Sequence, residues 1–394
     1  MAILSGTLSF TRCAAGGGVP KRLDAALVEK LAEHVIGKQS AARPDHVECG
    51  WVGGDHVLDR HFAVEKNVVG ETVHFGLRID TARCPADLMR AYTRLELDAL
   101  LHAAGAERPT RTQRREARAN AERRVEREVR EGRFHRAKFV PVLIDSAADA
   151  VLLGSAAPAV FDQFHPLYHT TFGRRIEQLS AGKLAYRLAE AHGAGRQVEQ
   201  AMPSAFVKHP RGESSPGVLW TQHDAASRDF LGNEFLLWLW WRVSEQGDAI
   251  ALADRRDAAV VFLKSLTLEC PWALSGKISI LADAPTSLPE ARRALRTGKL
   301  PRRAGLMIAS QGLQFELSLS AETFAVTGAV ITDPEADADD SDAGPDAIER
   351  VSQVRTLCQT LDGLFDVFLR RRLSGAWRED LPAIGKWLRN DGDE

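Results

Sequence analysis

Cysteine is scarce in this sequence and follows no pattern. Five cysteines are scattered along 394 residues, and no two of them form a CxxC pair. Zinc-binding modules and disulfide-rich scaffolds both need cysteines at recurring spacings. We therefore expect the reduced thiols of a cytosolic protein, with neither a disulfide framework nor a zinc site. The cysteines are Cys13, Cys49, Cys84, Cys270 and Cys358.

Long apolar stretches are missing as well. The chain has no window of 18 or more consecutive apolar residues, so we expect no membrane-spanning helix. Its first residues, MAILSGTLSFTRCAAGGG, have neither a charged beginning nor a long apolar segment, which predicts that no secretory signal is present. Both observations favour a cytoplasmic protein that does not associate with membranes.

Sequence motifs of common enzymes are also absent. The chain contains neither a GxxxxGK(S/T) nucleotide-binding loop nor a GxSxG nucleophile motif. One polar stretch, GGDHVLDRH, contains Asp55, His56, Asp59 and His61, all of them residue types that bind metal ions. This cluster leaves a metal-dependent nuclease as an alternative, although its spacing matches no catalytic pattern with a physical basis. We otherwise expect no enzymatic activity and no cofactor.

What the sequence does contain is a local excess of arginine. The stretch from Glu107 to Lys138 carries 11 arginines and one lysine against six glutamates, a net charge of +6. The whole chain has a formal net charge of −2, so the remaining residues sum to −8. Salt screens charges beyond about 10 Å, and a basic patch therefore keeps its own field even when distant acids balance it.

Residues 83–135 are predicted to form a projecting hairpin of two helices. The first helix begins near Pro85 and ends at Gly105. The second runs from Arg111 to Glu131 without proline or glycine and would span about 30 Å. Its apolar residues recur every fourth position, which is enough to lean on one neighbour but not to be buried. These residues are Ala117, Ala121, Val125 and Val129.

The arginines of the second helix allow two interpretations. They can form a solvated surface of i, i+4 ion pairs, such as Glu126 with Arg130, or they can bind phosphate. The dominance of arginine over lysine favours phosphate, because the guanidinium fork matches phosphate oxygens. Phe134 follows in the polar stretch GRFHRAKF, where an aromatic exposed at the tip of the projection would contact a partner surface. The candidate DNA-binding residues are Arg111, Arg114, Arg115, Arg118, Arg123, Arg124, Arg127 and Arg130.

The remainder of the chain predicts an α+β fold of several domains. Strand, hairpin and helix patterns before and after the helical hairpin resemble each other. This indicates a central domain made of residues 1–82 and 136–185, with residues 83–135 inserted between its halves. Residues 186–394 would form a further domain.

Two segments of this further domain have a distinctive composition. Trp238, Trp240 and Trp241 lie in a segment rich in leucine and phenylalanine, which predicts buried core rather than a platform for stacking bases. Residues 333–346 are rich in acids, proline and glycine, and we expect them to form a disordered loop.

The order of these parts resembles the RdgC family of recombination-associated proteins. CGWVGG precedes a hairpin, CP opens a helix, and a basic helix leads into GRFHRAKFVPVLID. In the C-terminal half, SLPEARRALRTGKLPRRAGLMIASQGLQFELSLSAETFAVTGAVI resembles the family's helix, GK pair and paired strands. FLGNEFLLWLWWRV and LDGLFDVFLRRRLSGAW look like its longer members. The resemblance covers about residues 1–182 and 228–378 and rests on the order of the motifs.

The resemblance implies a fold, an assembly and a function. RdgC proteins are non-enzymatic, horseshoe-shaped chains with a central domain, a helical tip and a base. Two chains close tip to tip and base to base into a ring that encircles duplex DNA without reading its sequence. The ring limits the loading of the RecA recombinase. By resemblance, this chain would be a homodimeric, nucleoid-associated DNA-binding protein of the cytoplasm that modulates homologous recombination.

The same resemblance suggests roles for individual residues. Phe134 falls where the family has an aromatic in the tip, and it would form the closing contact there. Lys299 of the GK pair, with Arg302 and Arg303, would face DNA from the base, near the inner wall of the ring. The apolar helix at the C-terminal end, near residues 348–373, would supply the second contact between the two chains.

The chain departs from the family pattern in two ways. Gly53-Gly54 stands where the family usually has proline, and the segments 185–228 and 333–346 are longer than in the family. Whether single-stranded DNA binds as well as duplex stays open at this point. A further alternative is a protein-interaction scaffold whose basic hairpin docks onto an acidic partner.

Overall fold

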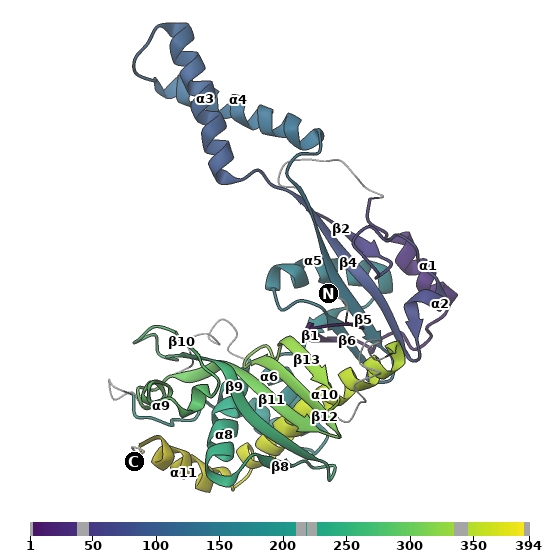
Figure 1. Ribbon diagram of the computed structural model, residues 1–394, viewed down its shortest axis with the longest axis vertical. Coiled ribbons are helices and arrows are strands. Elements are labelled where there is room, and N and C mark those ends of the chain that lie inside the picture. Colours follow the sequence, from purple (N-terminus) through teal and green to yellow (C-terminus); the bar gives the residue numbers. More distant parts are fainter. Residues whose placement is uncertain (1–2, 38–46, 210–217, 219–226, 335–345, 390–394) are drawn as a thin grey trace.

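The computed structural model describes residues 3–37, 47–209, 218, 227–334 and 346–389. The fold is mixed α+β, as the sequence predicts, and it is built on one open sheet in which the named strands pair antiparallel (Figure 1). Most of the acidic stretch expected to be a loop, residues 333–346, lies outside the described residues.

The N-terminal half of the chain forms one end of the sheet. Its longest pair, the fourth and fifth strands, aligns over their full length, with Thr72 opposite Asp145 and Ala82 opposite His135. The strands are β1 (Leu8–Ala15), β2 (Val47–Val52), β3 (Val68–Val69), β4 (Thr72–Ala82), β5 (His135–Asp145), β6 (Ala150–Leu153) and β7 (Ile176–Gln178).

The C-terminal half forms the other end of the sheet. Its strands alternate buried and exposed residues, which is the pattern of a sheet with one face on a core and one face in solvent. The strands are β8 (Ala249–Ala251), β9 (Asp257–Glu269), β10 (Ile278–Leu281), β11 (Leu300–Ser310), β12 (Leu313–Ser320) and β13 (Val326–Thr332).

The first strand of the chain joins the two ends. The strand order is β10-β9-β11-β12-β13-β1-β6-β5-β4-β2, with β3 on β4, β7 on β1 and β8 on β9. Leu8 in the first part of β1 pairs with Ala329 of β13, whereas Thr11 in its second part pairs with Leu153 of β6. A single strand near the N-terminus therefore connects segments from both halves of the sequence.

Helices of the N-terminal half cover one face of its strands. Trp51 lies at the centre of the buried cluster, where its ring meets Phe75 and Phe164 edge to face. The stretch 62–80, FAVEKNVVGETVHFGLRID, reads in the sequence as a hairpin of two strands; β3 and β4 do pair around Gly70, but a helical turn precedes them. The side chain of Asn67 ends this turn by donating to the carbonyls of Gly53 and His74. The helices are α1 (Ala25–Glu33), α2 (Val64–Asn67) and α5 (Pro158–Phe172).

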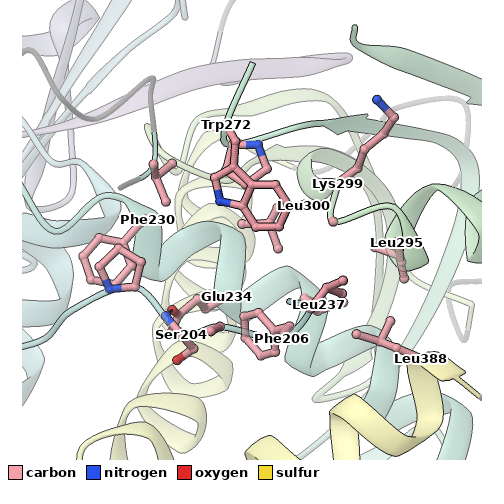
Figure 2. A pocket seen from close by; sticks show the side chains of 16 residues that line it. Ser204, Phe206, Phe230, Glu234, Leu237, Trp272, Leu295, Lys299, Leu300 and Leu388 are labelled. Carbon is pink, nitrogen blue, oxygen red and sulfur yellow. Dashed lines mark hydrogen bonds between the residues drawn. The ribbon is translucent and has the colours of Figure 1, made fainter. Parts of the chain in front are cut away.

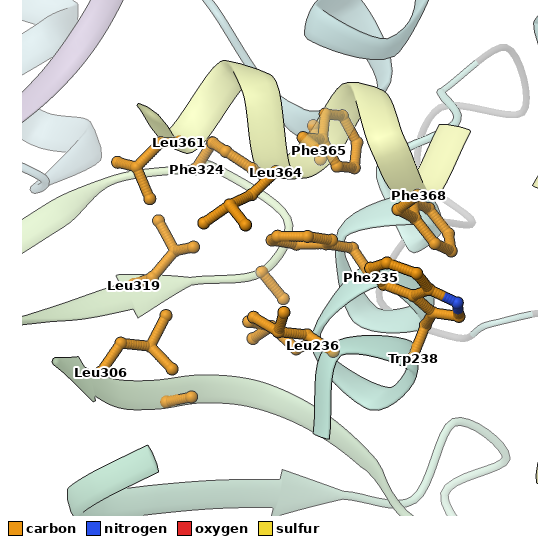
Figure 3. Packing of buried hydrophobic residues seen from close by; sticks show 14 of the residues in the cluster. Phe235, Leu236, Trp238, Leu306, Leu319, Phe324, Leu361, Leu364, Phe365 and Phe368 are labelled. Carbon is orange, nitrogen blue, oxygen red and sulfur yellow. The ribbon is translucent and has the colours of Figure 1, made fainter. Parts of the chain in front are cut away.

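Helices of the C-terminal half enclose the larger core. Phe235 packs with Phe365 and Phe368 at ring distances of 5.2 and 5.8 Å, and Trp238 lies 5.7 Å from Phe368 (Figure 3). The expectation that the tryptophan segment is core is confirmed, because Trp238, Trp240 and Trp241 are all buried. The helices are α6 (Ala181–Glu190), α7 (Gly195–Glu199), α8 (Phe230–Gln246), the 3-10 turn η2 (Pro285–Ser287), α9 (Pro289–Arg296), α10 (Ala347–Arg372) and α11 (Trp377–Arg389).

The apolar stripe of the long helix α10 packs inside the chain. Its apolar stripe, including Leu357, Leu361 and Leu364, is buried against α8 and the sheet (Figure 3). The expectation that this stripe forms a contact between two chains is therefore wrong. The sequence predicts that the apolar stripe is covered by another surface. In the structure that surface is the core of the same chain.

Candidate nucleic-acid interface

A helical hairpin projects from the end of the sheet. It consists of α3 (Ala86–Ala104), the loop 105–110 and α4 (Arg111–Arg130). The strands β4 and β5 carry it, and Figure 1 shows both helices beyond the end of the sheet, with the loop farthest from it. Gly105 ends α3 in the left-handed conformation, and Thr110 with Gln113 forms a capping box at the start of α4. Both ends of the loop are thus fixed by local hydrogen bonds.

A small core holds the two helices together. Ala121, Val125 and Val129 of α4 pack against Tyr92 of α3. The Tyr92 hydroxyl donates a hydrogen bond of 2.7 Å to Glu128, the buried acid of α4. This hydrogen bond is the main reason that the pKa of Glu128 lies below its usual value; burial opposes it, and neighbouring arginines reinforce it. The sequence did not single out this acid, which takes up positive charge inside the hairpin.

Five arginines of α4 have no partner in the part of the chain that the structure describes. They are exposed, and no ion pair or side-chain hydrogen bond involves them among the described residues. Arg123 and Arg127 share one side of the helix, because they are four positions apart. This side faces away from the buried Ala121. Free guanidinium groups on an exposed helix can exchange water for phosphate without breaking an internal pair. The five are Arg111, Arg114, Arg115, Arg123 and Arg127.

The other three candidate arginines of α4 have internal partners. Arg118 lies 3.1 Å from Glu122 and Arg130 lies 3.8 Å from Glu126, both in exposed i, i+4 pairs that contribute little and can exchange. Arg124 is different, because its guanidinium stacks 4.2 Å from the Tyr92 ring centre and pairs with the buried Glu128. Arg124 therefore helps to hold the hairpin together, and its contact with phosphate stays a prediction.

The basic surface continues beyond α4 into the sheet. Arg136 and Lys138 are exposed at the start of β5, two positions apart and therefore on one face of the strand. Neither was among the candidate DNA-binding residues, although both lie within the charged stretch. The alternation of basic residues with Ala137 was the signal that could have identified them. Together with the five unpaired arginines of α4 they extend the positive surface toward the sheet.

Phe134 does not lie at the far end of the projection. It follows α4 directly before β5, at the root of the hairpin, and it packs against the hairpin core in a half-buried position. Its φ of 65° is left-handed, which continues the turn that starts at Gly132. The expectation of an exposed aromatic at the tip is wrong, because the polar neighbours of Phe134 are exposed while its ring folds back. A dimer contact through this residue stays a prediction.

Two of the three candidate residues in the C-terminal half are engaged internally. Lys299 is buried and donates to Ser275 Oγ at 2.6 Å and to the Gly276 carbonyl. Figure 2 shows its ammonium pointing away from the apolar residues of the neighbouring pocket. The burial of Lys299 contradicts the expectation that it faces DNA.

Arg302 and Arg303 differ in their surroundings. Arg302 lies between two acids, 2.7 Å from Glu269 and 2.6 Å from Glu322, so its charge is compensated within the chain. The contact of Arg302 with phosphate stays a prediction, and it would have to compete with these two internal pairs. Arg303 is exposed on β11 and bonds the Thr327 hydroxyl, and it remains available to an external anion.

The pocket of Figure 2 contains no free charge that would serve chemistry. Glu234 at its edge accepts hydrogen bonds from the Ser204 backbone at 2.6 Å and from Arg372 Nε at 2.5 Å. The other lining side chains are mostly apolar, among them Phe206, Phe230 and Leu237. We assign this pocket no part in nucleic-acid binding.

The four residues that suggested a metal-dependent nuclease do not converge. Asp59 is buried and accepts from Lys66 and from the backbone N–H groups of Asp55 and His61. A lysine therefore occupies the position that a cation would take. Within the described ranges no group of three histidine, cysteine or acidic side chains is arranged to hold a metal ion. The ligand set behind the nuclease alternative is not formed.

Replacing Asp59 with asparagine is expected to lower the free energy of unfolding by about 2 kcal/mol at pH 7, because a charged acceptor is lost. Burial alone would raise the pKa of Asp59, but hydrogen bonds from Lys66 and the backbone lower it below its usual value. A carboxylate with a lowered folded pKa stabilises fully above its unfolded value of about 3.9 and loses this contribution as the pH falls through the folded value. The difference in the free energy of unfolding between wild type and Asp59→Asn should therefore become smaller as the pH is lowered.

Urea unfolding at pH 7 and pH 3 measures this difference. Asp55→Asn is the control, since Asp55 is 60% exposed, pairs with the same lysine at 3.1 Å and should change stability little. If wild type and Asp59→Asn differ in their free energy of unfolding by the same amount at both pH values, the ionised carboxylate of Asp59 is not the stabilising group.

Comparison with known proteins adds no assignment to this geometry. The chain matches no protein-family model, and no curated protein matches it at a significant level. Among the described residues, none of the helices has the length and apolar character needed to cross a bilayer. The RdgC resemblance therefore rests on the order of sequence motifs, and what it implies is treated below as a proposal.

Proposed function

We propose that this protein binds duplex DNA without sequence preference, through the exposed arginines of α4. The observation that carries the proposal is the set of five unpaired arginines on a projecting helix, continued by Arg136 and Lys138 on β5. Sequence-independent binding needs positive charge placed along the phosphates and no particular code for base edges. Glu128, the one buried acid of α4, is turned inward against Tyr92, and the exposed arginines of the helix outnumber its exposed acids, Glu116, Glu122 and Glu126.

The assembly that we propose is a homodimeric ring of two horseshoe-shaped chains around DNA. It follows from the resemblance to the RdgC family, in which the tips of two chains meet. The exposed Leu95 on α3, 57% accessible in the single chain, supports a contact at the hairpin, because a large apolar side chain on a projecting helix is better covered by a partner. Leu95 replaces Phe134 as our leading candidate for this contact.

The cellular role that we propose is modulation of homologous recombination in the nucleoid, by limiting the access of RecA to DNA. A ring on the duplex would do this by occupying DNA without chemistry and without a cofactor. The exposed Leu95 also fits the alternative of a protein-interaction scaffold, in which the basic hairpin docks onto an acidic protein. The two functions differ in whether DNA itself binds.

Salt dependence and topology test the proposal together. If each chain neutralises about five phosphates, the logarithm of affinity should fall with the logarithm of salt concentration at a slope near −4.5 for each chain bound. Fluorescence anisotropy on a labelled duplex gives this slope. Retention on circular duplex with loss from linear duplex of equal length, after a high-salt wash, is expected for a ring.

The outcomes separate the alternatives. A flat salt response would remove DNA binding through α4 and favour the scaffold. A steep slope with equal loss from circles and linear molecules would keep the interface and remove the ring. Single-stranded DNA of the same length, measured in parallel, shows whether duplex is preferred.

A further inference from the structure

A cavity lies at the joint between the two halves of the chain. Strands β1, β5 and β6 form one wall, and α6 and α10 form the other. Its volume is about 240 Å³, which is enough space for several water molecules. The bond from Arg355 of α10 to Asp145 of β5 closes one side of the joint, and Figure 1 shows α10 reaching the N-terminal strands.

The charged residues around this cavity do not balance. Arg12, Arg187 and Arg355 line it together with only two carboxylates. Asp145 is saturated, because it accepts both bonds of the Arg355 fork, at 2.6 and 2.8 Å, and two backbone N–H groups.

Two arginines therefore share the remaining carboxylate. Asp362 lies 2.5 Å from Arg12 and 3.4 Å from Arg187. Cys358 adds no charge, since burial raises the pKa of its thiol to about 11. Among the residues that line the cavity, arginines therefore outnumber carboxylates by one; the exposed Glu71, outside the lining, lies 3.8 Å from Arg355.

Arg12 is the clearest sign of a missing partner. It is only 4% exposed, and its Nε and Nη2 have no hydrogen-bond partner among the described residues. One side of the guanidinium is covered by the Phe324 ring, at 5.7 Å. Burial opposes the charge, but the neighbouring Asp362 raises the pKa of Arg12, so the group stays cationic. Buried polar groups in folded proteins almost always have a partner, and an anion supplies one for both nitrogens.

The rest of the lining is apolar. Leu143, Leu152 and Val354 come from three different elements and face the same space. A site of this kind, apolar with a few placed charges, is typical of small-molecule pockets. We propose that the cavity binds a small organic anion, a carboxylate on a short unbranched apolar chain, with the carboxylate on Arg12 and Arg187. Because the cavity spans the joint, the ligand would brace α10 against the N-terminal strands.

Hexanoate is the probe, since it joins one carboxylate to a short unbranched apolar chain. Isothermal titration of the full chain should show one site with a dissociation constant between about 10 µM and 1 mM. Hexanamide, the neutral analogue, should bind at least tenfold more weakly. Binding of inorganic phosphate as tight as that of hexanoate would overturn the assignment of an apolar chain, and no heat from hexanoate at 10 mM would overturn the site.

Two variants on one helix locate the binding. Arg187→Gln should weaken hexanoate at least tenfold, whereas Lys183→Gln should not. The pair is matched, because both side chains lie on α6, both pair with a carboxylate, and they are 47% and 51% exposed. Equal effects of the two variants would place binding elsewhere and overturn the proposal. DNA affinity is read separately, since neither residue belongs to the interface on α4.

Discussion

Replacing Arg114, Arg115, Arg123 and Arg127 together with glutamine is expected to weaken duplex binding about four-thousandfold at 0.1 M salt. Each phosphate contact releases close to one counterion, so each loss lowers the logarithm of affinity by about 0.9 at this salt concentration. The slope against salt should become shallower by about 3.6 for each chain. Glutamine keeps the helix, because its propensity is close to that of arginine and none of the four has an internal partner among the described residues. Anisotropy titrations between 0.05 and 0.4 M salt measure both quantities.

A second quadruple variant separates local from overall charge. Arg22, Arg60, Arg196 and Arg255 are exposed on other elements, and none forms an ion pair within the described part of the chain. Their replacement with glutamine changes the net charge equally but leaves α4 intact. If this variant loses as much affinity as the first, binding depends on the net charge of the whole chain and the interface on α4 is rejected. Circular dichroism of both variants checks that helix content is unchanged.

Local patterns were enough to predict the hairpin that carries this interface. Gly105 marks the end of one helix, and the run from Arg111 to Glu131 lacks any residue that breaks the next. These are signals between near neighbours in the sequence. The order of the two helices already implies that Phe134, which follows the second helix, lies at the root of the hairpin, so its placement at the tip was an error of inference. Whether its ring is exposed is a different question, because it depends on packing against Tyr92 and its neighbours. The polarity of GRFHRAKF does not contain that information.

The sequence could not predict which basic side chains bond to residues far away in the chain. Arg302 looked free because no acid stands near it in its own segment, yet Glu269 at the end of β9 and Glu322 in the turn after β12 both pair with it. Lys299 was similarly placed in a basic segment, but the turn that contains Ser275 encloses it. Arginines on a projecting helix such as α4 have few neighbouring elements, so few distant acids can pair with them. Exposure was therefore predicted better on α4 than in the C-terminal half.

Gly232→Ala is expected to cost at least about 3 kcal/mol of stability. Gly232 is buried in α8 where this helix crosses the end of β12, and an added Cβ would lie 1.9 Å from the Ala321 carbonyl oxygen and 2.9 Å from Ala181 Cβ. The first atom belongs to the backbone and the second to another buried helix, so neither can yield. Urea or guanidinium unfolding measures the loss.

Gly363→Ala provides the matched comparison. Gly363 also lies within a helix, α10, but the nearest atom to an added Cβ is the mobile end of Leu252, at 3.0 Å. Alanine is favoured over glycine within a helix by about 1 kcal/mol, and this gain applies equally at both sites. The control variant should therefore stay within about 1 kcal/mol of wild type. Similar stability of the two variants would show that α8 can move away from β12 at little cost.

The position of β1 has a consequence for the time at which the protein can fold during synthesis. Leu8 pairs with Ala329, which is synthesised more than 300 residues later. The first part of β1 therefore has no strand to pair with until nearly the whole chain has left the ribosome. At about 5–20 residues per second, this interval lasts on the order of tens of seconds. Ile3, Leu8 and Phe10 belong to the larger, C-terminal core and not to the core beside them in sequence. The residues that are synthesised first thus complete the core that is synthesised last. Substitutions at these residues should therefore destabilise the C-terminal half of the protein.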